Sequence, residues 1–224
     1  MNNPIRAVIF DLDNTLTDRP SSIRRYAEKF FSDFRSMMTT GVHAEDVHRV
    51  IQAGDGGGYR PKEALFQEIQ ENISWVDLPD QSTIAEHWYR MSPLCMILRP
   101  GTQCTLTTLL RRGFTLGIIT NGKTHVQNAT IDATHIRPFF ASIVISEESG
   151  VRKPDPAIFE LMLSALNVRS DQAAYIGDNP ESDIQGAHNA GLHSIWFTDG
   201  SEWSAGLRLP SHQISRIPQL LELL

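Results

Sequence analysis

Asp11 and Asp13 are two carboxylates, one residue apart, that directly follow the apolar run Ala7–Phe10. Such a run is typical of a buried strand. Two ionised carboxylates this close repel each other unless a cation or a proton compensates them. If the chain stays extended, both side chains point to the same face and can reach one ligand. The pair therefore predicts a site that handles a cation, a proton or both.

Further reactive side chains follow this run and other short apolar runs. They are Thr15, Thr120, Asn121, Lys153, Asp178 and Asp183. Carboxylate oxygens with few histidines nearby suit Mg²⁺, which keeps several of its waters. A hydroxyl, the backbone amides of a Gly-containing loop and a lysine suit an anion. A metal, an anion and a nucleophilic carboxylate together predict phosphoryl transfer.

The apolar runs themselves predict the elements that hold these residues. Strands are expected at Arg6–Phe10, Phe114–Thr120, Ser142–Ser146, Ala173–Gly177 and Ser194–Thr198. Helices are expected between them and over Ile217–Leu224. Short strands that are apolar on both faces and alternate with helices predict a parallel sheet covered on both sides. Ligands bind beyond the carboxyl ends of such strands, where all the residues named above fall.

The segment from Ser21 to Met91 has a different pattern, in which apolar residues recur every three or four positions. It predicts four helices with no strand among them, which indicates a small bundle inserted after the first strand. Ser21 or Ser22 is the expected cap of the first helix. We expect an α/β fold: a three-layer Rossmann-like core of residues 1–17 and 95–224, with an α-helical cap at 18–94.

Composition narrows the class of protein. The chain has 224 residues and a net charge of −6, so it lacks the basic balance expected of a protein that binds nucleic acid or an anionic membrane. No apolar run approaches the ~18 residues of a membrane span, and the N-terminus does not resemble a signal peptide. We therefore expect a cytoplasmic protein. Cys95 and Cys104 are expected to be reduced thiols.

Four segments carry a resemblance to a known family. They are "DLDNTLTD" from Asp11, "TNG" from Thr120, "RKPDPAIF" from Arg152 and "GDNPESDIQGA" from Gly177. In this order they resemble the four motifs of the haloacid dehalogenase-like (HAD) superfamily, over nearly the whole chain. The helical insertion is similar to the cap of the subfamily with a helical-bundle (C1-type) cap. The resemblance implies a Mg²⁺-dependent phosphatase that hydrolyses a small phosphorylated metabolite through an aspartyl phosphate.

The resemblance also implies roles for single residues. Asp11 would be the nucleophile, and Asp13 the acid that protonates the leaving oxygen and then the base that activates water. Mg²⁺ would be held by a carboxylate oxygen of Asp11, the backbone carbonyl of Asp13 and Asp178. Lys153 would balance the charge on Asp11 and on the phosphoryl group.

Supporting roles follow for the remaining motif residues. Thr120 and the backbone amide of Asn121 would bind phosphoryl oxygens. Asp183 would orient a metal-bound water or the lysine, and Thr15 would steady Asp13. An acid that must carry a proton at working pH should not bind the metal through its carboxylate, which agrees with this division of labour.

The Gly-rich stretch "AGDGGGYRPK" at 53–62 lies between two predicted cap helices. It is either a flexible connector or a segment whose Tyr59, Arg60 or Lys62 contacts the substrate. Among functions, a phosphomutase of sugar phosphates shares every core motif and stays open. A dehalogenase is disfavoured, because that branch of the family lacks an acid at position 13. A phospho-receiver signalling module is disfavoured by the length and by the insertion. Monomer and homodimer are both open.

Overall fold

The computed structural model describes residues 4–204 and 206–224, and the chain divides into two compact units. The core unit combines the residues up to Thr17 with Leu98–Leu224, and the cap unit comprises Asp18–Ile97. The segment 18–94 that the sequence predicts as a cap lies within the second unit. Each unit is described on its own below.

The described residues of the core unit form one six-stranded sheet with the order β3-β2-β1-β4-β5-β6. The strands are β1 (Ala7–Phe10), β2 (Thr115–Thr120), β3 (Ser142–Ile145), β4 (Ala173–Gly177), β5 (His193–Phe197) and β6 (His212–Ile214). All neighbouring strands pair in parallel. The chain builds the sheet in one direction from β1 to β3 and in the other from β4 to β6. The switch between β1 and β4 is where an open parallel sheet binds its ligand.

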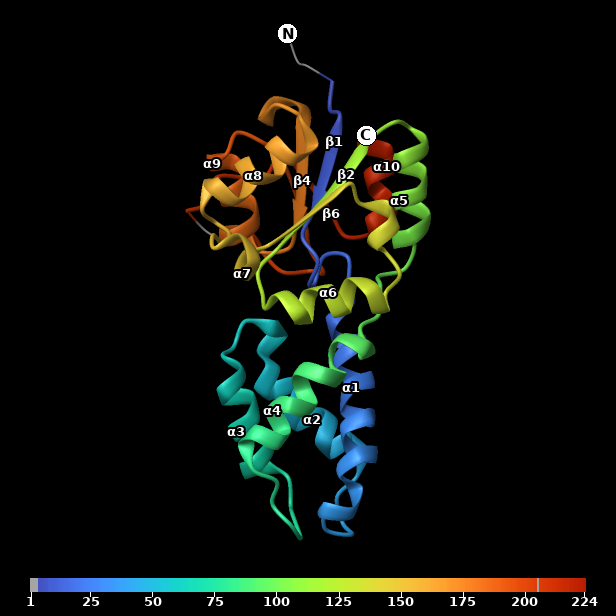
Figure 1. The fold of residues 1–224 in the computed structure, drawn as a ribbon, viewed down its shortest axis with the longest axis vertical. Coiled ribbons are helices and arrows are strands. Elements are labelled where there is room, and N and C mark those ends of the chain that lie inside the picture. The colour runs from blue at the N-terminus through green and yellow to red at the C-terminus, as the bar shows by residue number, and fades with distance from the viewer. Residues whose placement is uncertain (1–3, 205) are drawn as a thin grey trace. The chain divides into compact units, whose positions relative to one another are not determined.

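Helices cover both faces of this sheet (Figure 1). The α-helices among the described residues of the core unit are α5 (Thr102–Arg111), α6 (Thr124–Ala133), α7 (Ser146–Ser149), α8 (Pro156–Leu166), α9 (Gly186–Asn189) and α10 (Leu220–Leu223). Val8 and Phe10 of β1 pack into an apolar cluster with α5, α6 and α10, whereas Ala7 and Ile9 pack into another with α8 and α9. This alternation explains why every residue of β1 is apolar.

The core confirms the predicted fold class and adds two features to it. The short strand β6 lies at the sheet edge, in a segment whose polar residues His212 and Gln213 gave no strand signal. In front of α9, residues Pro180–Gln185 form a π-helical turn rather than the start of a regular helix. This wider turn carries Asp183.

The cap unit is a helical bundle built from α1 (Arg19–Phe34), α2 (Ala44–Asp55), α3 (Lys62–Asn72) and α4 (Gln81–Met91) (Figure 1). Its core is rich in aromatic rings, including Phe30 and Phe34, which stack at 4.4 Å. The expected cap of α1 is wrong, because Asp18 rather than a serine occupies the N-cap and accepts from the backbone N–H of Ser21. The negative charge of an aspartate at this position also interacts favourably with the positive end of the helix dipole.

Two further expectations can be checked on the described residues. None of their helices is long and apolar enough to cross a membrane. Both cysteines are free thiols, with Cys95 buried in the cap and Cys104 exposed on α5.

Candidate active site

The loop after β1 brings Asp11 to the switch point of the sheet. The backbone N–H of Asp11 donates to the carbonyl of Ile176, which continues the pairing of β1 with β4 by one residue. Leu12 and Leu16 are fully buried and anchor the loop in the core. β1 ends at Phe10 and Asp13 lies in a turn, so the two carboxylates do not share the face of one strand. Asp11 and Asp13 consequently face different partners.

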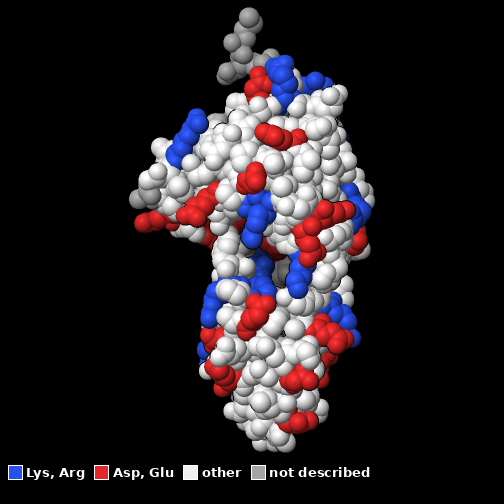
Figure 2. Space-filling view, turned by 60° about the vertical axis from the view of Figure 1, so that its left-hand side comes forward, with Lys and Arg blue, Asp and Glu red and all other residues white. Residues whose placement is uncertain are grey.

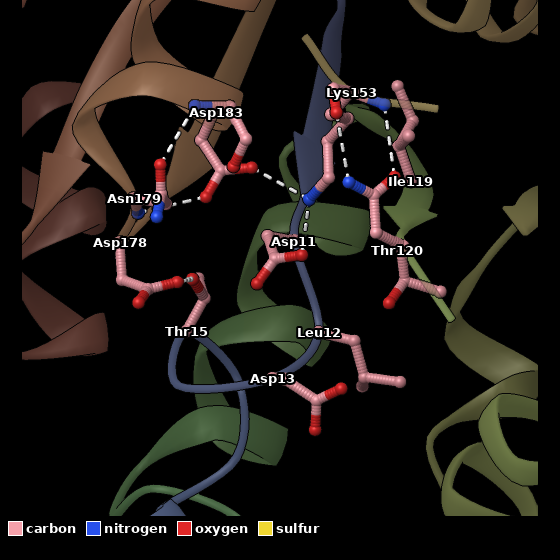
Figure 3. A network of polar contacts seen from close by, with 12 residues as sticks. Asp11, Leu12, Asp13, Thr15, Ile119, Thr120, Lys153, Asp178, Asn179 and Asp183 are labelled. Atoms are coloured by element: carbon pink, nitrogen blue, oxygen red, sulfur yellow. Dashed lines mark hydrogen bonds and ion pairs between the residues drawn. The ribbon is translucent and has the colours of Figure 1, made fainter. Parts of the chain in front are cut away.

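Lys153 forms the centre of a buried ion-pair network (Figure 3). Its ammonium contacts a carboxylate oxygen of Asp11, Oδ1 of Asp183 at 2.7 Å and the hydroxyl of Tyr175 at 3.0 Å. The backbone of Lys153 is held by Asn121, whose side chain donates to its carbonyl and accepts from its N–H, both at 3.0 Å. The side chain of Asn121 thus links the loop after β2 to the lysine.

Both carboxylate oxygens of Asp183 accept hydrogen bonds. Oδ1 accepts from Lys153 and from the hydroxyl of Tyr175, and Oδ2 accepts from the backbone N–H of Asn179 at 2.9 Å. The carboxylate lies so close to β4 that a Cβ on Gly177 would be 2.4 Å from Asp183 Cβ. A glycine before Asp178 is therefore required by packing against the acid of the next turn.

Asp178 follows β4 and lies beside Asp11 and Asp183 (Figure 3). The three carboxylates each offer an oxygen within 4.8 Å of the others. Oδ1 of Asp178 accepts from the hydroxyl of Thr15 at 3.2 Å, so Thr15 contacts this acid, whereas the sequence led us to expect it beside Asp13. The carbonyl of Asp178 accepts from the indole N–H of Trp196.

The charges of this cluster bear on its protonation. Burial raises the pKa of Asp11 well above its ordinary value, although the ammonium of Lys153 acts in the opposite direction. Burial alone would lower the pKa of Lys153, but the carboxylates of Asp11 and Asp183 outweigh it and raise that pKa. The lysine is therefore an ammonium, while a charged Asp11 calls for a further cation.

The residues present fit Mg²⁺ in that role. Since Asp183 already accepts from three donors, Asp11 and Asp178 are the carboxylates best placed to hold a cation. Oxygen donors in small number are what this ion prefers, because it keeps part of its water shell. A magnesium ion beside Asp11 and Asp178 would favour their ionised forms.

Asp13 contacts a different set of groups. Its Oδ2 accepts from Nε2 of Gln127 at 2.9 Å, and the same nitrogen lies 2.6 Å from the hydroxyl of Thr120. Thr120 ends β2 and Gln127 lies in the first turn of α6. The general acid implied by the resemblance thus accepts a hydrogen bond from a neutral amide.

Sequence reasoning did not single out Gln127 or Tyr175. The signal for Tyr175 is its position in β4, whose other residues are small or aliphatic, with a hydroxyl that needs a buried partner. The signal for Gln127 is a polar side chain in the first turn of α6, the helix that follows the "TNG" loop after β2. Neither signal alone separates these residues from ordinary core or surface positions.

Arg60 belongs to the cap unit. Its guanidinium donates to the carbonyl of Ala53 at 2.8 Å and to Glu68 at 3.2 Å, which ties the Gly-rich stretch to α2 and α3. Its predicted contact with substrate stays a prediction. The same stretch contains a buried carboxylate, Asp55, which accepts from Arg19 and from Lys62. The sequence did not reveal this ion-pair cluster.

Comparisons with known proteins identify the family of this chain. The family described as haloacid dehalogenase-like hydrolase matches residues 5–191. A glyceraldehyde 3-phosphate phosphatase of Pyrococcus furiosus is 32% identical over 98% of this chain and 93% of its own.

Solved structures share the fold. Bacillus subtilis YfnB, in a crystal form bound to magnesium, has a TM-score of 0.76 at 22% identity over 99% of both chains. A 2-haloacid dehalogenase of Pseudomonas syringae has a TM-score of 0.62 at 28% identity over 98% of this chain and 97% of its own. The resemblance inferred from the four motifs is thus confirmed, and the chain belongs to the haloacid dehalogenase-like hydrolases.

Proposed function

We propose that this protein is a Mg²⁺-dependent phosphoric monoester hydrolase that cleaves a small phosphorylated metabolite through an aspartyl phosphate on Asp11. The observation that carries the proposal is the separation of two carboxylates. Asp11 lies in an ion-pair cluster with Lys153 that suits a charged nucleophile, and Asp13 accepts a hydrogen bond from the neutral amide of Gln127. A phosphatase needs both roles within one site.

In the first step a carboxylate oxygen of Asp11 attacks the phosphorus and the bond to the ester oxygen breaks. Asp13 gives its proton to that oxygen, so that an alcohol leaves. Lys153 favours the ionised form of Asp11 and faces the charge of the phosphoryl group. Thr120 and the backbone N–H of Asn121 bind phosphoryl oxygens. Mg²⁺, held by Asp11, Asp178 and the carbonyl of Asp13, would supply charge stabilisation when bound.

In the second step the roles of Asp13 reverse. Its carboxylate accepts a proton from water while the water oxygen attacks the phosphorus. The bond between phosphorus and Asp11 breaks, which releases phosphate and restores both acids to their starting state. One residue therefore serves as acid and then as base.

Phosphate ester hydrolysis is favoured over dehalogenation by Asp13 itself. A halide leaves as an anion and needs no proton, whereas an alkoxide leaving group does. The Pyrococcus furiosus relative is named a phosphatase and extends over nearly the whole chain. We infer a phosphatase on these two grounds.

The mixed charge of the surface agrees with a small substrate rather than with a large polyanion. On the face drawn in Figure 2, Lys and Arg side chains are interspersed with Asp and Glu side chains. We propose that the cap selects the metabolite and that Arg60 contributes to its binding. A cytoplasmic location and a monomeric or homodimeric state are part of the same proposal.

The test is phosphate release from p-nitrophenyl phosphate and from a panel of phosphorylated metabolites, with Mg²⁺ and with EDTA. We expect turnover that requires the metal and is abolished in Asp11→Asn. Arg60→Ala should raise KM for the true substrate far more than it lowers kcat. Turnover that persists in EDTA, or in folded Asp11→Asn, contradicts the mechanism.

A further inference from the structure

Gln127 is a buried polar side chain that connects two groups of the proposed site. Nε2 lies 2.9 Å from Oδ2 of Asp13, 2.6 Å from Oγ1 of Thr120 and 3.4 Å from the carbonyl of Asn121. All four residues belong to the core unit, and they come from the loop after β1, from β2 with its following loop, and from α6. One amide therefore spans residues with different roles in the reaction.

The chemistry of these partners fixes which end of the amide faces them. A carbonyl oxygen only accepts hydrogen bonds, and so does an ionised carboxylate oxygen, so the side-chain nitrogen of Gln127 and not its oxygen must face Asp13 and Asn121. The nitrogen carries two hydrogens, which suit its two shorter contacts, to Asp13 and Thr120. Thr120 Oγ1 is then an acceptor in this pair.

We propose that Gln127 is a positioning residue of the phosphatase reaction, which orients the carboxyl group of Asp13 toward the leaving oxygen and the hydroxyl hydrogen of Thr120 toward a phosphoryl oxygen. This inference rests on the proposed function. The amide of Gln127 donates a hydrogen bond to Oδ2 of Asp13 and so fixes the orientation of the carboxyl group that transfers the proton. Since Oγ1 of Thr120 accepts from Gln127, its own hydrogen is turned to another acceptor, which in the substrate complex is a phosphoryl oxygen.

Gly122 packs directly against the side chain of Gln127. A Cβ on Gly122 would lie 3.0 Å from Cγ and Cδ of Gln127 and 3.1 Å from its Nε2. This is tighter than ordinary contact, so even a methyl group would press on the amide. Gly122 thus leaves the space in which Gln127 reaches both Asp13 and Thr120. The glycine of the "TNG" segment has a steric role that its backbone amide alone does not explain.

The main test uses Gln127→Met, which keeps the volume of the side chain and removes its donor. The measured quantity is the release of alcohol or phenol in the first turnover with Mg²⁺. An alkyl phosphate needs a proton on its leaving oxygen, whereas p-nitrophenolate leaves without one. Since general acid catalysis contributes roughly 10²–10⁴-fold, we expect the alkyl rate to fall by about 30-fold or more and the aryl rate by only a few-fold. The second step also uses Asp13, so the variant should show a burst of p-nitrophenolate.

Two further variants control the test. Gln103→Met makes the same change on α5, where the amide donates to the carbonyl of Thr134 at 3.4 Å, and should leave both rates at the wild-type level. Gly122→Ala should reproduce part of the preference for the aryl ester and add little in the Gln127→Met background, because both changes act on one amide. Gly122→Ala also keeps the test available if the methionine variant fails to fold.

The outcomes separate this inference from the proposed function. If the wild type hydrolyses neither ester with Mg²⁺, the proposed function fails. If the wild type is active but folded Gln127→Met keeps both rates, or loses both by the same factor, the positioning role is refuted and the phosphatase stands. A selective loss on the alkyl ester, shared by Gly122→Ala, supports the inference.

Discussion

Tyr175→Phe removes one buried hydroxyl from the network around Lys153 and leaves the rest of the side chain unchanged. The hydroxyl lies 3.0 Å from the ammonium of Lys153, 3.0 Å from Oδ1 of Asp183 and 3.4 Å from the carbonyl of Ile119. Because the side chain is fully buried, water cannot simply take the place of the lost hydroxyl as a hydrogen-bond partner. The ring itself packs edge-on against Phe159 at 5.1 Å, and phenylalanine keeps this contact.

The magnitude follows from these contacts. Hydrogen bonds to charged groups contribute about 1.5–3 kcal/mol to the free energy of unfolding. Asp183 keeps its bonds to Lys153 and Asn179, so the loss should stay within this range. For a protein of this size 1 kcal/mol corresponds to about 2–4 °C, which predicts a decrease in the melting temperature of the core unit of about 3–12 °C. Lys153 keeps two carboxylate partners but loses a third contact, so kcat should fall while activity remains detectable.

The assay is differential scanning calorimetry together with steady-state hydrolysis of p-nitrophenyl phosphate in Mg²⁺. For the melting temperature alone, Tyr59→Phe is the matched control, since Tyr59 is 61% exposed and its change should shift the free energy of unfolding by less than about 0.5 kcal/mol. If Tyr175→Phe melts and turns over as the wild type does, the hydroxyl does not hold the lysine and the account of the network is wrong.

Three other predictions concern packing, pH and buried charge. Gly177→Ala should lower the free energy of unfolding by about 1–3 kcal/mol and remove most of the activity, because its Cβ would lie 2.4 Å from Asp183 Cβ. Near-normal stability and kcat would show that Asp183 can move to make room for the methyl group. Burial lowers the pKa of His87 in the cap, so the unfolded chain binds its proton more readily and the stability of the cap should fall as pH drops below about 6.5. Melting curves of wild type and His87→Gln between pH 7 and 5 should therefore converge toward low pH, and parallel curves would contradict this. Asp55→Asn leaves two buried or half-buried cations without their carboxylate and should destabilise the cap by about 3–5 kcal/mol, read by hydrogen exchange in α2; unchanged protection would refute the pairing.

The sequence predicts well which residues lie at the carboxyl edge of the sheet, because apolar strand residues give way to polar residues there. Each of the strands from β1 to β5 is a short, mainly apolar run, and after β1, β2 and β4 the residue types change abruptly to acids or to Asn-Gly. Since parallel strands end at one edge, the proximity of Asp11, Lys153, Asp178 and Asp183 follows from their positions in the chain. The structure brings these four residues together.

Other parts of the site depend on tertiary contacts that leave little local signal. Gln127 is one polar residue in a helix, and only the packing of α6 against β2 and the loop after β1 reveals its partners. The divergence of Asp11 and Asp13 depends on where β1 ends, and period-two reasoning fails once the chain turns. Thr15 likewise reaches Asp178 because of that turn. The ion pairs of Asp55 join α1, α2 and α3, so no local pattern contains them.

The central claim is that the carboxylate of Asp11 becomes phosphorylated. The direct measurement is an acid quench of Asp13→Asn after incubation with Mg²⁺ and ³²P-labelled p-nitrophenyl phosphate, whose leaving group needs no proton, followed by peptide mapping. Asp13→Asn should slow the second step and leave labelled phosphate on the peptide that contains Asp11, with no label in the Asp11→Asn variant. Label on another residue, or the absence of a labelled enzyme while wild type releases phosphate under the same conditions, would contradict the claim.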